Sequence, residues 1–100
     1  QHLLDHELED EERRQIQESV IAHPQVLGMH DLRTRRSGGQ IFIQLHLELD
    51  DRLALIQAHS IADEVEAAVM QHFPNSEIII HEDPQSMVDQ QSVSDRYVSL

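Results

Sequence analysis

The segment from Gln40 to Leu49 alternates along its length between two kinds of side chain. One set is aliphatic and the other mostly polar: Ile41, Ile43, Leu45, Leu47 and Leu49 alternate with Phe42, Gln44, His46 and Glu48. Because successive side chains of a strand point to opposite faces, this pattern predicts a strand over 40–48 with one aliphatic face. Other elements must cover that face, which restricts the chain to a layered fold.

Two segments carry apolar residues at helical spacing. The first predicts a helix that starts at about Glu7, behind an acidic first turn, and ends before Pro24. The second predicts a helix that is capped by Asp50 or Asp51 and runs to about Phe73. These two helices can supply the cover that the strand requires.

Two further strands complete the predicted elements. Residues 26–36 read as a strand, and the Ser-Gly-Gly turn at 37–39 joins them to the central strand as a hairpin. Residues 77–81 read as the last strand, since their centre is a run of three β-branched isoleucines. The predicted order is therefore α-β-β-α-β.

This order predicts an α+β sandwich, with a three-stranded sheet covered by two helices on one face. It corresponds to a ferredoxin-like split βαβ unit that lacks its first strand. The open face of such a small sheet needs water or a second copy, so we expect a homodimer. We divide the chain into a lead-in at 1–6, a domain at 7–84 and a mostly disordered tail at 85–100, which is rich in Ser, Gln and Asp.

The charge balance excludes several classes of partner. Nineteen acidic residues against seven Arg and no Lys give a net charge of -12, which argues against nucleic acid and anionic lipid. The chain has no Cys, so thiolate metal sites and thiol catalysis are excluded. No apolar run is long enough to span a bilayer. Eight His in an acidic chain favour transition metals over calcium or magnesium.

The strand alternation selects a few of these imidazoles as candidate ligands. His46 points away from the aliphatic face, and His81 and Asp83 project together from the last strand. His30 lies on the strand that pairs with the one bearing His46. His59 lies at the margin of the apolar stripe of the second helix, from which it can reach a sheet edge or a partner molecule.

These five side chains exceed the four ligands of one tetrahedral zinc, which points to two ions that share the Asp83 carboxylate. Taken singly, a strand histidine is more often a structural residue. An alternative from another class is a regulatory module that binds a small organic ligand at a dimer interface. A metallohydrolase is a third, more distant one: two bound metals can activate water, but no spare base or oxyanion donors mark a substrate pocket, so no enzyme is predicted.

Four blocks of the sequence resemble one family closely. They are H-P-Q-V-L-G-M-H-D-L-R-T-R (23–35), I-Q-L-H-L-E-L (43–49), I-Q-A-H-S-I-A-D-E-V-E (56–66) and F-P-N-S-E-I-I-I-H-E-D-P (73–84). The family is the cytoplasmic C-terminal domain of bacterial cation diffusion facilitators of the YiiP/FieF type. The resemblance covers about residues 8–84, and Leu3-Leu4-Asp5 resembles the exit from that family's last transmembrane helix.

The resemblance implies a metallochaperone-like αββαβ domain on the cytoplasmic side of the bacterial inner membrane. In the family this domain hangs below a transmembrane portion that exchanges zinc, and in some members iron, cadmium or manganese, for protons. It implies a homodimer held by a binuclear zinc site. The implied ligands are His30, His46, His59, His81 and bridging Asp83, with a main-chain carbonyl at Glu82 as a further donor and His59 from either protomer.

Overall fold

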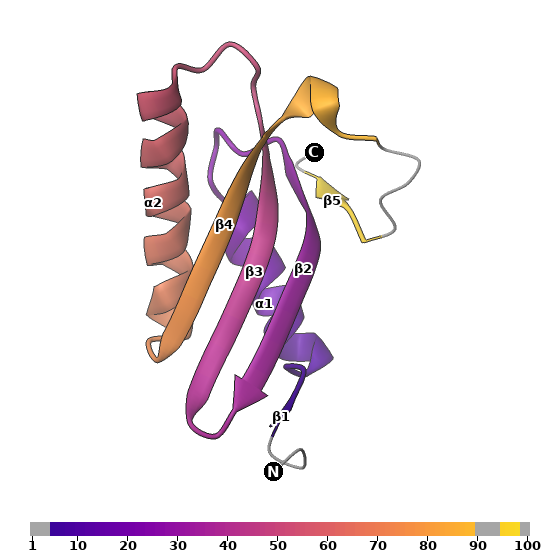
Figure 1. Ribbon diagram of the computed structural model, residues 1–100, viewed down its shortest axis with the longest axis vertical. Helices are drawn as coiled ribbons and strands as arrows, with labels where there is room; N and C mark the ends of the chain where they lie inside the picture. The colour runs from indigo at the N-terminus through magenta and orange to yellow at the C-terminus, as the bar shows by residue number, and fades with distance from the viewer. Residues whose placement is uncertain (1–4, 90–94, 99–100) are drawn as a thin grey trace.

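The computed structural model describes residues 5–89 and 95–98. Its helices are α1 (Asp10–Ile21) and α2 (Leu55–His72), and a 3-10 turn, η2, spans Gln85–Met87. Its strands are β1 (Asp5–His6), β2 (Gly28–Ser37), β3 (Gln40–Leu49), β4 (Ser76–Pro84) and β5 (Tyr97–Val98). Figure 1 shows the three long strands side by side. Neither helix within these residues has the length and apolarity that a membrane span needs.

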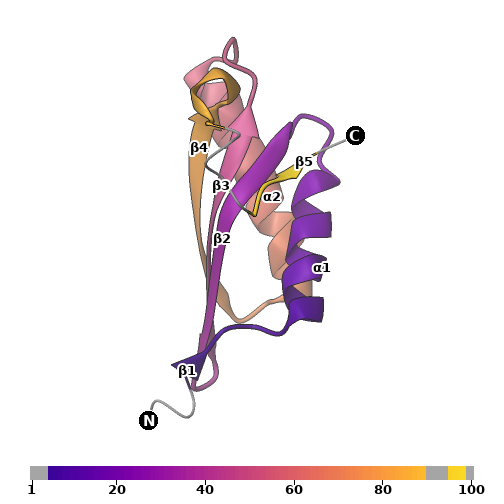
Figure 2. The same ribbon diagram turned by 90° about the vertical axis from the view of Figure 1, so that its right-hand side faces the viewer.

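One mixed sheet organises the molecule. β2 and β3 form the antiparallel hairpin, whereas β4 lies parallel to β3, so α2 serves as the crossover between them. Both helices cover the same face of the sheet (Figure 2). The predicted α+β, ferredoxin-like sandwich is thus confirmed. The strand count differs slightly, because β1 and β5 add two short pairings to the outer edge of β2.

The core lies between the sheet and the two helices, and it is aliphatic. β3 contributes Ile43, Leu45 and Leu47, each with at most 1% of its surface exposed, as its alternation predicts. The helices contribute the buried residues Ile16, Val20, Ile61, Val65 and Val69. On the open face of β3, the alternating residues Phe42, Gln44 and His46 are half-buried, whereas Glu48 is fully buried.

A β-bulge at Asp31 changes which face the side chains of β2 occupy. The register pairs His30 with His46 but Arg33 with Gln44, which places one extra residue in β2. Asp31 takes a positive φ of 57°, a conformation that Asp tolerates better than most side chains. Strict alternation would put His30 on the same face as buried Leu32. The bulge instead lets His30 face away from the core while Leu32 enters it.

The helix boundaries differ from the sequence prediction at their N-termini. α1 begins after Glu9, whose amide donates to the Glu12 carboxylate at 3.0 Å. α2 begins after Ala54, so the predicted cap at Asp50 or Asp51 is wrong. Both carboxylates bind elsewhere: Asp50 accepts the amide of Arg52, and Asp51 accepts the hydroxyl and the amide of Ser86.

Two described parts of the segment predicted to be mostly disordered, 85–87 and 97–98, have regular secondary structure. η2 follows β4 directly, and β5 pairs with the start of β2, Tyr97 opposite Met29 and Val98 opposite Gly28. At the other end of the chain, β1 falls within the predicted lead-in and pairs with the last residues of β2. The rest of that lead-in, residues 1–4, and residues 90–94 and 99–100 of the tail lie outside the described residues.

Candidate metal centre

Three imidazoles occupy one rung across the three long strands. His30 of β2 lies opposite His46 of β3, and His46 lies beside His81 of β4. The His30 and His46 rings stack at 5.0 Å between centroids, and the His46 and His81 rings stack at 4.4 Å. The bulge at Asp31 and the alternation of β3 and β4 together bring all three rings to the face away from the helices.

Asp83 of β4 contacts two of these rings. Its Oδ2 lies 3.0 Å from Nδ1 of His46 and 3.4 Å from Nε2 of His30. Two ligands at 2.0–2.2 Å from a tetrahedral zinc are about 3.4 Å apart, which is the separation of the His30 and Asp83 atoms. The shorter His46–Asp83 contact is a hydrogen bond. Within residues 5–89 and 95–98, His30, His46 and Asp83 form the one group of metal-ligating side chains whose donor atoms all lie within 4.8 Å.

The His30 ring is oriented by the buried carboxylate of Glu48. Glu48 is fully buried, and its Oε2 lies 2.8 Å from Nδ1 of His30. A carboxylate only accepts, so Nδ1 carries the proton and a neutral ring has its lone pair on Nε2. That lone pair faces a second acceptor, Oδ2 of Asp83. A cation between these two acceptors satisfies both, which is the arrangement of a carboxylate–histidine–metal site.

His81 lies next to this group. As the sequence predicts, it shares a face with Asp83, and its ring stacks on His46. Its Nε2 lies 3.2 Å from the side-chain nitrogen of Gln44. His81 therefore lies beside the three clustered candidate ligands, with Asp83 two residues away on the same strand.

His59 is the one predicted ligand that lies away from both the cluster and the histidine rung. It lies on α2 with 69% of its side chain exposed, and its Nε2 is 3.4 Å from Asp63, one helical turn on. Since α2 covers the opposite face of the sheet, His59 faces solvent and not the histidine rung of its own chain.

Sequence reasoning missed the support of the site. The alternation of residues 40–49 places Glu48 opposite the aliphatic face without giving it a role, and Arg96 falls in the segment 85–100 that is predicted to be mostly disordered. In the structure Arg96 donates hydrogen bonds to the Glu48 carboxylate from Nε at 2.9 Å and from Nη2 at 2.6 Å. An arginine far from any periodic segment carries no local signal, whereas a glutamate on an otherwise aliphatic strand end is a signal that could have been used.

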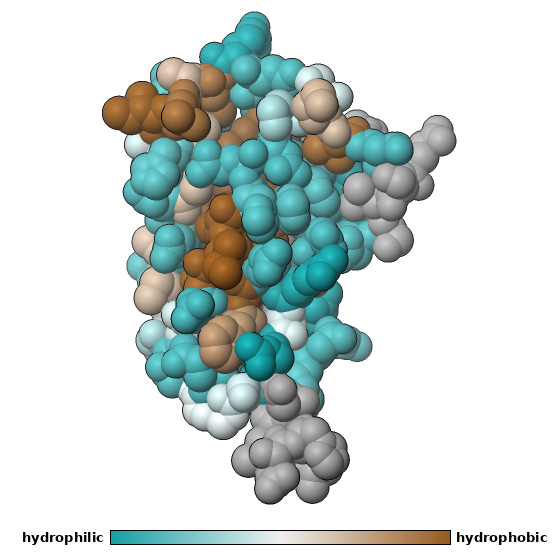
Figure 3. Space-filling view, viewed as in Figure 1, coloured by the Kyte–Doolittle hydropathy of each residue, from teal (hydrophilic) through white to brown (hydrophobic). Residues whose placement is uncertain are grey.

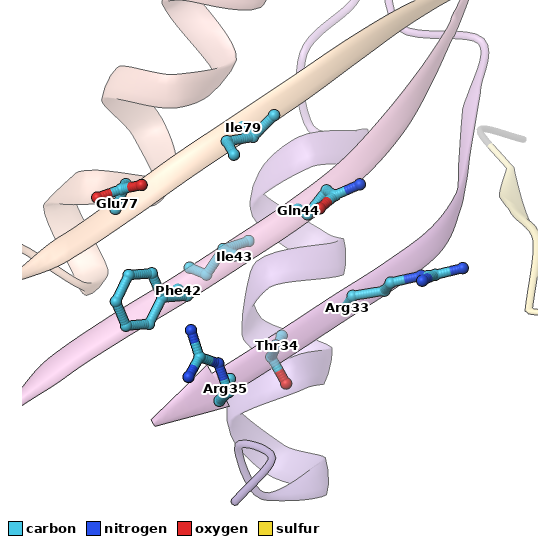
Figure 4. A pocket seen from close by; sticks show the side chains of 8 residues that line it. All are labelled: Arg33, Thr34, Arg35, Phe42, Ile43, Gln44, Glu77 and Ile79. Carbon is cyan, nitrogen blue, oxygen red and sulfur yellow. The ribbon is translucent and has the colours of Figure 1, made fainter. Parts of the chain in front are cut away.

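A shallow hollow lies on the same face, nearer the β2–β3 turn. Its lining includes Arg33, Arg35, Phe42, Glu77 and Ile79, and none of the five predicted ligands (Figure 4). The Arg35 guanidinium lies 4.4 Å from the centre of the Phe42 ring. Figure 3 shows hydrophobic surface gathered over β3 and β4 on this face, and Ile79 keeps 49% of its surface exposed.

Comparison with known proteins agrees with this architecture. Residues 8–85 match the family model ZT_dimer, described as the cytoplasmic domain of cation efflux proteins. The chain is 57% identical over 88 residues to the cation-efflux pump FieF of Klebsiella pneumoniae subsp. pneumoniae, covering 88% of this chain and 29% of that protein. The FieF of Escherichia coli O1:K1 / APEC is 56% identical over the same lengths. The chain thus spans under a third of these relatives.

Solved structures of MamM C-terminal domain (CTD) variants have a similar fold. A MamM CTD variant in its nickel form superposes with a TM-score of 0.70 at 26% identity, covering 76% of this chain and 98% of that one. A cadmium form also has a TM-score of 0.70 at 26% identity, covering 75% and 95%. The chain belongs to the family of cation efflux protein cytoplasmic domains.

Proposed function

We propose that this chain is the metal-binding, dimer-stabilising regulatory domain of a divalent-cation/proton antiporter, on the cytoplasmic side of the bacterial inner membrane. The observation that carries the proposal is the approach of Asp83 Oδ2 to one nitrogen each of His30 and His46, at 3.4 and 3.0 Å. The full-length relatives are cation-efflux pumps, and the chain corresponds to less than a third of them. The transport step itself would belong to the remaining part of such a protein, and no enzymatic role is proposed for this chain.

The first ion would be held by His30, His46 and Asp83. Two imidazoles and a carboxylate suit zinc better than calcium or magnesium, and iron, cadmium or manganese are further candidates. Nickel, cadmium and manganese forms of MamM CTD variants show that related domains have been studied with several divalent metals.

A second ion would use the other side of Asp83. The other carboxylate oxygen of Asp83 and the imidazole of His81 would supply two ligands, and we propose that His59 of a second copy supplies a third. The exposure of His59 on α2 supports this role, because an exposed side chain can reach into another molecule. The main-chain carbonyl of Glu82 is a further candidate ligand.

We propose that the homodimer covers the open face of the sheet. Ile79 and Phe42 supply apolar surface there, and Arg33 and Glu77 supply charges of both signs. A two-fold interface pairs one patch with itself, so a patch of mixed sign can be complementary to its own copy.

The test is a zinc titration of the metal-stripped chain by calorimetry at neutral pH. We expect two ions per chain, loss of both with Asp83→Ala, and loss of one with either His46→Ala or His59→Ala. His72→Ala serves as the control, since His72 is exposed at the end of α2, away from the cluster. Unchanged stoichiometry and affinity in both His46→Ala and Asp83→Ala would reject the site. Stabilisation by an organic ligand that is insensitive to chelator would favour a small-molecule-binding module instead.

A further inference from the structure

Residues 95–98 of the C-terminal tail contact two parts of the chain that position His30: the Glu48 carboxylate and the bulge at Asp31. β5 pairs with the first two residues of β2, and this pairing places Arg96 beside Glu48. The ion pair is well shielded: the Arg96 side chain is 17% exposed and Glu48 is fully buried. Because Arg96 is a planar fork with fixed donor geometry, its bond to both Glu48 oxygens fixes the rotation of that carboxylate.

The second contact is made by Asp95. Its Oδ1 accepts the backbone N–H of Asp31 at 3.0 Å, at the residue whose positive φ forms the bulge. The bulge is what turns His30 to the open face. The tail therefore contacts both the carboxylate that orients the His30 ring and the backbone next to it.

The Glu48 side chain and the tail backbone both pack closely against Gly28 of β2. A Cβ added at Gly28 would lie 2.6 Å from Oε1 of Glu48 and 3.2 Å from the backbone oxygen of Tyr97. Only a glycine leaves the Glu48 carboxylate room to lie over β2 between His30 and Arg96. Three segments, β2, β3 and the tail, thus converge on one buried charge.

We propose that Arg96 is a positioning residue for the metal centre, and that residues 95–98 form a strap that holds Glu48 in the place where it fixes His30. The relay runs from the Arg96 guanidinium to the Glu48 carboxylate, and from there to the Nδ1–H of His30, whose Nε2 then faces Asp83. The strap lies outside residues 8–85, to which the family match extends. This inference rests on the metal-binding function proposed above.

The first experiment measures the His30 ring without any metal. In the ¹⁵N-labelled, metal-stripped chain at about pH 8, where an ordinary imidazole is neutral, the ring nitrogen shifts report which nitrogen carries the proton. We expect the Nδ1–H form to dominate in the native chain and both forms to appear in Arg96→Gln. The control is Arg52→Gln, which removes an arginine paired with exposed Asp50 and should leave His30 unchanged. Identical His30 spectra in the native chain and Arg96→Gln would overturn the relay.

The second experiment measures zinc affinity by competition with a chromophoric chelator. Loss of an outer partner of a metal-ligating histidine costs about 10–100-fold in affinity, so we expect that weakening in Arg96→Gln, with the number of ions unchanged. In a Glu48→Gln background, Arg96→Gln should weaken zinc affinity hardly any further, because the carboxylate through which Arg96 acts on His30 is already absent. Equal weakening in both backgrounds would overturn a route through Glu48.

One further variant guards against misfolding, and the metal-free spectra separate the two proposals. Arg96→Lys keeps the positive charge but loses the planar, two-pronged guanidinium. We therefore expect this variant to fold, and to show both protonated forms of the His30 ring, Nδ1–H and Nε2–H. Should zinc binding prove independent of Asp83 and His46, the proposed metal function fails, yet the metal-free spectra still decide whether Arg96 controls His30.

Discussion

Gly28 is the residue on which the packing around Glu48 depends most directly. We predict that Gly28→Ala destabilises the chain by about 1–3 kcal/mol, because the new methyl group collides with the Glu48 carboxylate. Gly39→Ala is the matched control, since a Cβ at Gly39 meets no atom within 4 Å. Urea denaturation of both variants measures the difference, and equal free energies of unfolding would show that the carboxylate does not occupy this space.

Some residues of the candidate site could be predicted from the sequence pattern, and others could not. His46, His81 and Asp83 follow from alternation, because regular strands fix the direction of every side chain. His30 does not, since the extra residue at Asp31 reverses the faces of β2 after it, and an Asp carries no unique bulge signal. Strand pairing made His30 a candidate ligand, and the position of His59 on the second helix made it another. The family resemblance implies both as ligands, and that assignment remains a prediction.

At the scale of elements, the loop before α2 holds the turn after β4. Ser86 donates to the Asp51 carboxylate through its hydroxyl and its amide, and these bonds lower the pKa of Asp51 below its usual 3.8. Arg52 likewise lowers the pKa of Asp50 to about 2. A carboxyl whose pKa is lower in the folded chain than in the unfolded chain stabilises the folded chain at any pH above the unfolded-state pKa. This stabilisation is lost as the pH falls through the folded-state pKa.

We therefore predict that η2 stays docked at neutral pH and loosens only under acid conditions, below pH 3.8. A ¹³C carboxyl titration of Asp51 by NMR follows this change. Ser86→Ala removes the hydroxyl donor and should return the pKa of Asp51 toward its usual value, with little effect on Asp50. An unchanged Asp51 titration in Ser86→Ala would contradict the assigned cause.

The elements themselves were largely predictable. Both helices and the three long strands follow from periodicity, because each buries one face against the same core. The start of α2 was missed because Asp50 and Asp51 resemble caps, yet their carboxylates bind Arg52 and Ser86. β5 was missed because Tyr97 and Val98 pair with distant β2, and the preceding Arg96 bonds distant Glu48, contacts that no local pattern records.

For the whole molecule, the open sheet face provides a test of the proposed dimer. We predict that Ile79→Asp gives a folded monomer, because a carboxylate at this half-exposed site resists burial against a second copy. Ile56→Asp is the control, since Ile56 is 75% exposed on α2, on the helix side of the molecule. Sedimentation equilibrium distinguishes the two, and an intact dimer in Ile79→Asp would place the interface elsewhere.

Zinc should couple this dimer to pH. Imidazoles must be unprotonated to ligate, so zinc binding should weaken as the pH falls and protons compete for the ring nitrogens. If the second site takes His59 from a second copy, the zinc-dependent part of dimerisation should disappear over the same range. Sedimentation with and without zinc at several pH values measures this, and a zinc effect that persists under acid conditions would contradict histidine ligation.

The parallel pairing of β3 with β4 has a consequence for how the chain acquires its site. The β2–β3 hairpin is local and can form early, but Asp83 reaches His46 only after the whole of α2 has been laid across the sheet. Contacts between residues distant in sequence form slowly, because the intervening chain must first be ordered. On a ribosome, a nascent chain would therefore carry His30 and His46 without the Asp83 carboxylate until synthesis has passed β4, so the proposed ion could be captured only after that point.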